Sequence, residues 1–172
     1  MRWWRVSLAA AALATGCINV NVTVPPSEEV ESDVQRVRRA IAEMRNVAVT
    51  LEVSLVEDSV YPRAEDGDVS VGRFSLTPLT RIADELPRGT RIPSVDPWGH
   101  PYLYWSSGTQ YLVLSTAADG RLDEPSRVET FLAAAGGRTA SPPVYTSCVE
   151  DDLVLVNAQL VQYPNRTIRQ CR

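Results

Sequence analysis

The sequence predicts an α+β domain in which one long N-terminal helix packs on a small antiparallel sheet. Two observations predict this fold class. In the first third of the chain, apolar residues recur at alternating spacings of three and four, which is the pattern of an amphipathic helix. The second half contains short runs of β-favouring residues separated by turn residues, which is the pattern of hairpins. A helix followed by several hairpins is typical of α+β proteins.

The composition of the 172 residues excludes several functional classes. Hydrophobic residues make up 44% and charged residues 22%, which is typical of a globular protein and argues against a wholly disordered chain. His100 is the single histidine and there are three cysteines, so zinc sites with four Cys or His ligands are not expected. The net charge of −4 provides no basic face for nucleic acid.

Residues 1–16 have the composition of a signal peptide. Arg2 and Arg5 precede an apolar stretch at residues 6–14, which is too short to span a bilayer. Small residues then lead directly to Cys17. This order resembles a bacterial lipoprotein signal, in which the cysteine is lipidated and becomes the new N-terminus.

The resemblance implies that a lipid on Cys17 anchors the protein in the cell envelope. The usual motif has leucine three places before the cysteine, where this chain has Ala14. Ordinary secretion, with cleavage nearby and a free thiol left behind, is the alternative. Ile18 is not the aspartate associated with inner-membrane retention, which favours the outer membrane. Residues 17–31 are expected to be a flexible tether to a domain at residues 32–172.

The long helix is predicted from near Asp33 to near Asp58, with Ser32 or Asp33 as its N-cap. A stripe of this length is expected to face the domain core, and a coiled-coil partner is the alternative. The seven apolar residues on this face are Val34, Val37, Ile41, Met44, Ala48, Leu51 and Leu55.

An acidic loop and a short helix are expected next. Residues 63–70 contain three carboxylates without the spacing of an EF-hand, and a solvated loop is expected there. Residues 76–86 predict a short helix, because four apolar residues share one face and Pro78 lies in the first turn. Those apolar residues are Leu76, Leu79, Ile82 and Leu86.

The second half of the chain predicts two hairpins. The first joins residues 102–105 to residues 111–115 through a Ser-Gly turn, and its aromatic residues are expected in part to fill the core. Residues 128–135 predict a helical turn, followed by a long loop that contains Gly and Pro pairs. The closing hairpin joins residues 152–156 to residues 159–163.

Two cysteines remain once Cys17 is assigned to the lipid. In the oxidising compartment that export implies, Cys148 and Cys171 predict a disulfide, and two free thiols are the alternative. The bond would close a loop of about 23 residues and stabilise the fold by about 3 kcal/mol.

The order of these features resembles the C-terminal globular domain of protein G, the major pseudopilin of type II secretion. The resemblance covers roughly residues 33–164 and implies a non-catalytic structural or interaction module linked to secretion or to pilus-like machinery. The residues that carry it are Asp96-Pro97-Trp98-Gly99-His100-Pro101-Tyr102, where the family has Asn in place of His, Ala118-Asp119-Gly120 and Asp152-Leu153-Val154.

The N-terminus departs from this family. Pseudopilins begin with a hydrophobic helix that forms the core of a filament, whereas this chain has a lipoprotein-like signal and a polar tether. We therefore do not expect it to polymerise as the major subunit does. The expected partners are the membrane, through the lipid, and secretion or pilus components, with no nucleic acid and no identified small-molecule substrate.

The resemblance also implies a Ca²⁺ site in the loop after the first hairpin. Carboxylate and carbonyl oxygens are the ligands that calcium prefers. About thirty residues separate Asp119 from Asp152, where the family has a short loop, and solvated turn carboxylates are the alternative. The residues at the matching positions or beside them are Leu114, Ser115, Asp119, Asp123, Glu124, Asp151 and Asp152.

An envelope hydrolase, or a calcium-dependent binding protein of another type, is the alternative function. A Ser-His-Asp or Cys-His arrangement would need His100, which lies between Gly99 and Pro101 and is expected to form hydrogen bonds within a turn. Asp119 with Asp123 or Glu124 has the residue types of a glycosidase pair, but no feature indicates a sugar-binding cleft. We therefore expect no catalytic residue.

Overall fold

The computed structural model describes residues 31–63, 67–135 and 142–171. Within it, Glu31–Arg172 forms one compact unit. The predicted signal at residues 1–16 and nearly all of the predicted tether lie outside the described residues. None of the described helices is both long enough and apolar enough to cross a membrane.

The predicted long helix is present as α1 (Asp33–Asp58). It begins with a capping box, in which Ser32 Oγ accepts a hydrogen bond from the Gln35 N–H at 3.3 Å. Gln35 Oε1 in turn accepts one from the Ser32 N–H at 2.8 Å. The helix ends at Ser59, whose φ of 63° lies in the left-handed region. Both ends are therefore determined by local sequence.

Seven strands form one sheet in the described part of the chain, in the order β1-β2-β3-β4-β6-β7-β5. Neighbouring strands are antiparallel except β5 and β7, which are parallel. A long N-terminal helix on a mostly antiparallel sheet confirms the predicted α+β class. The strands are β1 (Val69–Val71), β2 (Phe74–Pro78), β3 (Leu103–Ser106), β4 (Tyr111–Ser115), β5 (Val144–Cys148), β6 (Leu153–Val156) and β7 (Gln159–Arg169).

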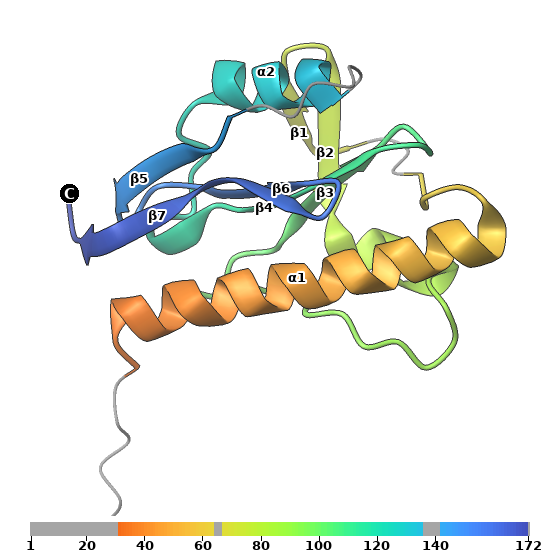
Figure 1. Cartoon of the computed structure of the whole chain (residues 1–172), viewed down its shortest axis with the longest axis horizontal. Coiled ribbons are helices and arrows are strands. Elements are labelled where there is room, and N and C mark those ends of the chain that lie inside the picture. The colour runs from red at the N-terminus through yellow and green to blue at the C-terminus, as the bar shows by residue number, and fades with distance from the viewer. Residues whose placement is uncertain (1–30, 64–66, 136–141, 172) are drawn as a thin grey trace, which may run out of the picture. The chain divides into compact units, whose positions relative to one another are not determined.

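Helices cover both faces of this sheet, with α1 on one face and α2 (Pro125–Ala135) on the other (Figure 1). Side chains of β4 alternate between the two cores, so Tyr111 and Val113 pack on the α1 side, and Leu112 and Leu114 pack on the α2 side. The apolar stripe of α1 faces the core as predicted, although Val34 is exposed. The buried residues of the whole helix are Val37, Ala40, Met44, Val47, Ala48, Leu51 and Ser54.

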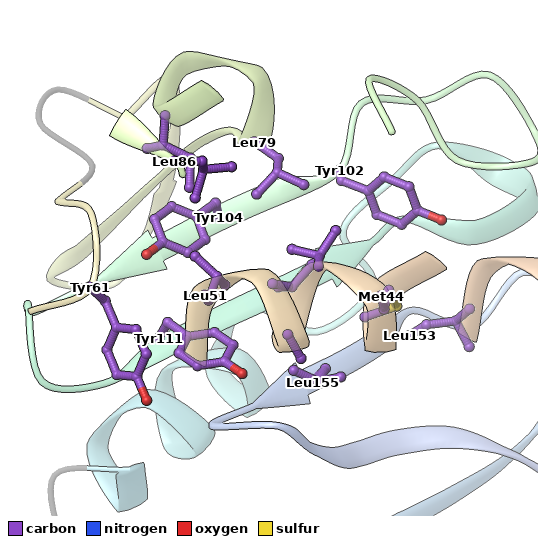
Figure 2. Close-up of a cluster of buried hydrophobic side chains, with 14 of the residues drawn as sticks. Met44, Leu51, Tyr61, Leu79, Leu86, Tyr102, Tyr104, Tyr111, Leu153 and Leu155 are labelled. Atoms are coloured by element: carbon purple, nitrogen blue, oxygen red, sulfur yellow. The ribbon is translucent and has the colours of Figure 1, made fainter. Parts of the chain in front are cut away.

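Tyrosines fill much of the core on the α1 side, next to leucines of the helix and the sheet (Figure 2). Tyr102, Tyr104 and Tyr111 are completely buried, and each hydroxyl has a partner. Tyr102 donates to Glu43 at 2.7 Å, Tyr111 donates to Glu52 at 3.3 Å, and Tyr104 donates to a main-chain carbonyl at 2.8 Å. These bonds offset the cost of burying the hydroxyls.

Both predicted hairpins are present. β3 and β4 pair with Tyr104 opposite Val113. β6 and β7 are joined by Asn157 and Ala158, whose φ values of 45° and 64° match a tight turn that follows the twist of the strands. The predicted helical turn at residues 128–135 is the C-terminal part of the longer α2.

Three predicted segments differ from the structure. The helix predicted at residues 76–86 begins only at Leu79, as the 3-10 helix η1 (Leu79–Glu85), because Leu76 belongs to β2. The start of β1 lies in the predicted acidic loop, so the β1–β2 hairpin was not expected. The long loop predicted before residue 147 contains β5, which pairs with β7.

Candidate functional site

The turn at residues 96–102 is held by one buried carboxylate. Asp96 is 4% exposed, and its Oδ1 accepts hydrogen bonds from the N–H groups of Trp98 at 3.0 Å and His100 at 2.9 Å. Its Oδ2 accepts a hydrogen bond from the Ser115 hydroxyl at 2.6 Å. Asp96 therefore shapes the turn and also attaches it to the end of β4.

His100 connects this turn to the acidic loop. Its Nδ1 lies 2.8 Å from the carbonyl oxygen of Ala117, so Nδ1 carries the proton and donates it. The ring also packs over Gly120, where an added Cβ would lie 2.6 Å from Nε2. Gly120 has a φ of 67°, so both its backbone and its surroundings favour glycine. His100 thus has the turn-forming contacts expected from the sequence.

Asp152 is the most unusual carboxylate of the acidic loop region. It precedes β6 and is 1% exposed, and its Oδ2 accepts a hydrogen bond from the Asp123 N–H at 3.0 Å. Its carbonyl accepts another at 3.0 Å from Gln162, which is also buried. Oδ1 is buried and has no hydrogen-bond partner among the described residues. A buried, ionised carboxylate with one unpaired oxygen destabilises the folded chain. Binding of a ligand or of a proton to Oδ1 would remove this destabilisation.

The electrostatic surroundings of Asp152 favour its neutral form. Burial raises the pKa of this carboxyl to about 7, the Asp123 N–H opposes the rise, and the charges of Asp123, Asp119 and Asp151 add to it. Three further carboxylates therefore lie within electrostatic reach of Asp152. A divalent cation among them would remove this repulsion and stabilise the ionised form.

The remaining predicted ligands have other contacts. Glu124 forms an ion pair with Arg127 at 2.7 Å and points toward α2. The Ser115 hydroxyl bonds to Asp96 and also accepts from the Ala117 N–H, so only its carbonyl remains for a metal. Leu114 is buried on the α2 side, and only its main chain can contribute.

Two of the four aspartates also make contacts of their own. Asp151 Oδ2 accepts from the Cys148 N–H at 3.0 Å, and Asp119 Oδ1 accepts from the Arg121 N–H at 3.0 Å. Asp119, Asp123 and Asp151 thus lie close enough to Asp152 for their charges to act on it, while two of them are also engaged in hydrogen bonds of their own.

The insertion between Asp119 and Asp152 does not separate the two halves of this site. The inserted residues form α2 and β5, and the chain then returns to β6, which pairs directly with β4. Ser115 lies opposite Leu153 in this pair, so the residues after β4 and those before β6 meet at one end of the sheet. Strand pairing therefore brings these two segments together although about thirty residues separate them in the sequence.

The donor set fits calcium in its chemistry. Calcium takes six to eight oxygen ligands, and the cluster offers several carboxylates and nearby main-chain carbonyls. Among the described residues, three Cys, His, Asp or Glu ligand atoms approach within 4.8 Å of one another only at Cys148, Glu150 and Cys171. As placed, no three of the four aspartates therefore bring ligand atoms this close together, and a calcium ion here would need main-chain carbonyls and water for most of its ligands.

The predicted disulfide is present between Cys148 and Cys171, which have a Cα separation of 5.5 Å. Beside it, the carboxylate of buried Glu150 accepts a hydrogen bond from the Cys171 N–H at 3.1 Å. The disulfide, rather than a metal, therefore accounts for the Cys148, Glu150 and Cys171 cluster.

Sequence reasoning did not identify Gln162 or the special position of Asp96. Gln162 binds the Asp152 carbonyl from β7, and no local signal distinguishes it from a solvent-facing glutamine. Asp96 was identified only as part of a turn motif, although its burial makes it the centre of that turn.

Comparison of the chain with models of protein families, with curated proteins and with solved structures finds no match. Inferences about function therefore depend on the residues and their geometry.

Proposed function

We propose that this protein is a non-catalytic, lipid-anchored envelope protein whose domain acts as a structural or interaction module of secretion or pilus-like machinery. One observation carries the proposal. A lipoprotein-like N-terminus precedes a long helix on an antiparallel sheet, with the Asp-Pro-Trp-Gly turn, the Ala-Asp-Gly loop and the closing hairpin in the order of a protein G pseudopilin domain. Similarity of motif order is the support for a role beside secretion components.

The surroundings of His100 support a non-catalytic role. Its Nδ1 proton is donated to Ala117, so this nitrogen is engaged within the fold. His100 lines a pocket of about 230 Å³, which is smaller than most ligand sites; among the described residues, its lining has one hydroxyl, of Thr116, and no carboxylate or thiol. A general base in a hydrolase would need a nucleophile or a water-activating partner within hydrogen-bond distance.

The lipid anchor gives a direct prediction. In bacteria fed a labelled palmitate analogue, the exported chain is expected to incorporate the label, and Cys17→Ser is expected to abolish it. The matched control is Cys148→Ser, which removes another cysteine and is expected to keep the label. Labelling that persists in Cys17→Ser would contradict the anchor.

We also propose that Asp152, with some of Asp119, Asp123 and Asp151 and with main-chain carbonyls and water, holds a structural calcium ion. The ion would supply positive charge that neutralises these carboxylates. Its support is the buried, unpaired Oδ1 of Asp152 and the three carboxylates that raise the pKa of that residue. The site would join the loop after β4 to the start of β6.

Calcium is expected to raise the melting temperature. With a Kd of about 1 mM, typical of extracellular calcium modules, about 10 mM calcium would stabilise the fold by roughly 1.4 kcal/mol, or roughly 4 °C. Asp119→Ala is expected to abolish the shift measured by differential scanning fluorimetry. Asp84→Ala removes an exposed carboxylate elsewhere and serves as the control. A wild-type melting temperature that is the same in calcium and in chelator would contradict the site.

A further inference from the structure

α1 carries a second apolar stripe, apart from the face that it buries against the sheet. We call Val49, Val53 and Val56 the outer valine stripe. Their exposed fractions are 66%, 42% and 83%, so all three contact solvent. Their spacings are four and three, which is the repeat of a helix that packs on another helix. Val60 is also exposed, but it lies beyond the helix end at Ser59.

The outer valine stripe and the buried face of α1 occupy different positions of one seven-residue repeat. If Asn46 and Val53 are assigned to one seam position, and Val49 and Val56 to the other, every buried residue of α1 falls outside the seam. Asn46, at the N-terminal end of this seam, is exposed. The helix therefore has one face for its own domain and a separate face suited to a second helix.

Valine is an unexpected choice for a solvent-exposed helix surface. Its branched side chain disfavours the helix relative to alanine, glutamate or arginine, so the three exposed valines of the stripe weaken α1. Isolated exposed apolar residues are common, but a stripe in register on one face marks an interaction surface. The N-terminal half of the same face is polar, with Arg38 and Arg45 exposed, which limits the apolar part to the C-terminal half.

Carboxylates flank the outer valine stripe. Glu52 and Glu57 lie on its two sides. The Glu52 carboxylate accepts hydrogen bonds from the hydroxyls of Tyr61 at 3.1 Å and Tyr111 at 3.3 Å, which hold it beside the stripe. Glu57 is exposed at the end of the helix. The negative charges of Glu52 and Glu57 therefore favour a partner helix that carries basic side chains beside its apolar stripe.

The same carboxylates disfavour a second copy of this chain. In a parallel pair, Glu52 of one copy would face Glu57 of the other at the flanking positions. In an antiparallel pair that also includes Asn46, Glu52 would face Glu52. Like charges at these positions repel, so the charge pattern favours a different partner.

We propose that the outer valine stripe docks an amphipathic helix of a partner protein, whose apolar residues recur every three to four positions and whose flanking positions carry Lys or Arg. This surface depends on neither the lipid anchor nor the calcium site. A negative binding test would therefore not affect the proposed function, and loss of the lipid anchor or the calcium site would not affect this docking surface.

The test uses two designed helical peptides of about 20 residues with the same apolar stripe, one with Lys and one with Glu at the flanking positions. Binding to the whole, disulfide-bonded chain is followed by NMR chemical-shift mapping, which detects a Kd up to about 1 mM. The Lys peptide is expected to shift the α1 resonances around the outer valine stripe and to bind more weakly at high salt. The Glu peptide is expected to cause no shift.

Variants of α1 assign the binding to this surface. The double variant Val49→Asp with Val56→Asp is expected to lower the affinity for the Lys peptide by at least about tenfold. The near-isosteric pair Val49→Thr with Val56→Thr is expected to lower it by less. Val34→Asp changes an exposed valine outside the stripe and is expected to bind as the wild type does. Glu57→Lys is expected to lower the affinity for the Lys peptide and raise that for the Glu peptide. Melting curves establish that each variant is folded.

Four results would overturn the proposal. The first is the absence of shifts with the Lys peptide at about 1 mM, and the second is equal binding of both peptides. The third is a concentration-dependent dimer in sedimentation that Val49→Asp with Val56→Asp abolishes, which would assign the surface to a second copy. The fourth is binding of the whole chain to anionic phospholipid vesicles that the same pair abolishes, which would assign it to a membrane.

Discussion

Asp152→Asn is expected to flatten the pH dependence of stability between about pH 4 and pH 7 in calcium-free buffer. Burial raises the pKa of Asp152 to about 7 in the folded chain, from an ordinary value of 3.8. Between these two values the unfolded chain has lost the proton and the folded chain keeps it. Folding therefore binds a proton in this range, and stability depends on pH.

The sign of the effect follows from this proton. Below about pH 4 the carboxyl is neutral in both states, and its favourable contribution is fully present. As the pH rises, the free energy of unfolding falls by roughly 1.4 kcal/mol per unit, and it levels off above about pH 7. The total loss is roughly 4 kcal/mol at most, since a shift of about three units sets it. Asparagine cannot ionise, so the variant lacks this slope.

The free energies of unfolding of the wild type and the Asp152→Asn variant are expected to differ most at alkaline pH. At pH 8 the wild type buries a charge among Asp119, Asp123 and Asp151, whereas the variant buries a neutral amide. The amide at the position of Oδ1 lacks a partner, which costs about 1–3 kcal/mol and leaves the variant roughly 1–3 kcal/mol more stable.

Urea denaturation from pH 4 to pH 8 with a chelator measures this difference. Asp84→Asn, an exposed site, is the control that keeps the wild-type slope. A wild type whose stability is constant or rises from pH 5 to pH 7, or a variant with an unchanged slope, would count against the buried, protonated Asp152.

Elements that depend on local sequence could be predicted. The ends of α1 follow from Ser32 with Gln35 and from the apolar repeat, all within a few residues of one another. The closing hairpin follows from the Asn157-Ala158 turn between two β-favouring runs. In these places propensity, capping and turn geometry all favour the same structure.

Elements that depend on distant partners could not be predicted in this way. Leu76 shares a helical spacing with Leu79, yet β2 forms because Thr77 pairs with Tyr104, far along the chain. Likewise, β5 contains the β-favouring residues Val144, Tyr145 and Thr146, but its parallel partner, β7, lies at the end of the chain. Pairing between distant segments leaves no local pattern to detect.

The candidate site also has features that could be predicted from the sequence and features that could not. The acidic residues were visible in the sequence, but their burial was not, because Asp152 precedes a hairpin strand where solvent exposure is the usual state. It is buried since β6 pairs with β4 and the loop containing Asp123 donates a hydrogen bond to it. The disulfide was predictable without knowledge of the fold, because the export signal accounts for Cys17, implies an oxidising compartment and leaves one pair of cysteines.

Removal of that disulfide by the pair Cys148→Ser and Cys171→Ser is expected to lower the free energy of unfolding by about 3 kcal/mol. The bond spans 23 residues, and its main effect is to restrict the unfolded chain. In the folded chain it joins β5 to the end of β7, where Cys148 lies opposite Arg169 and the Val149 N–H donates to the Arg169 carbonyl at 2.9 Å.

Urea denaturation of three samples tests this expectation: the oxidised wild type, the wild type reduced with dithiothreitol, and the double serine variant. The reduced wild type and the variant are expected to have similar midpoints, and dithiothreitol is expected not to change the variant. Native-state hydrogen exchange adds a local measurement, because the Val149 amide should exchange faster once the bond is absent. If the midpoint and this exchange rate both stay at wild-type values, then hydrogen bonding at the β5–β7 edge suffices without the covalent link.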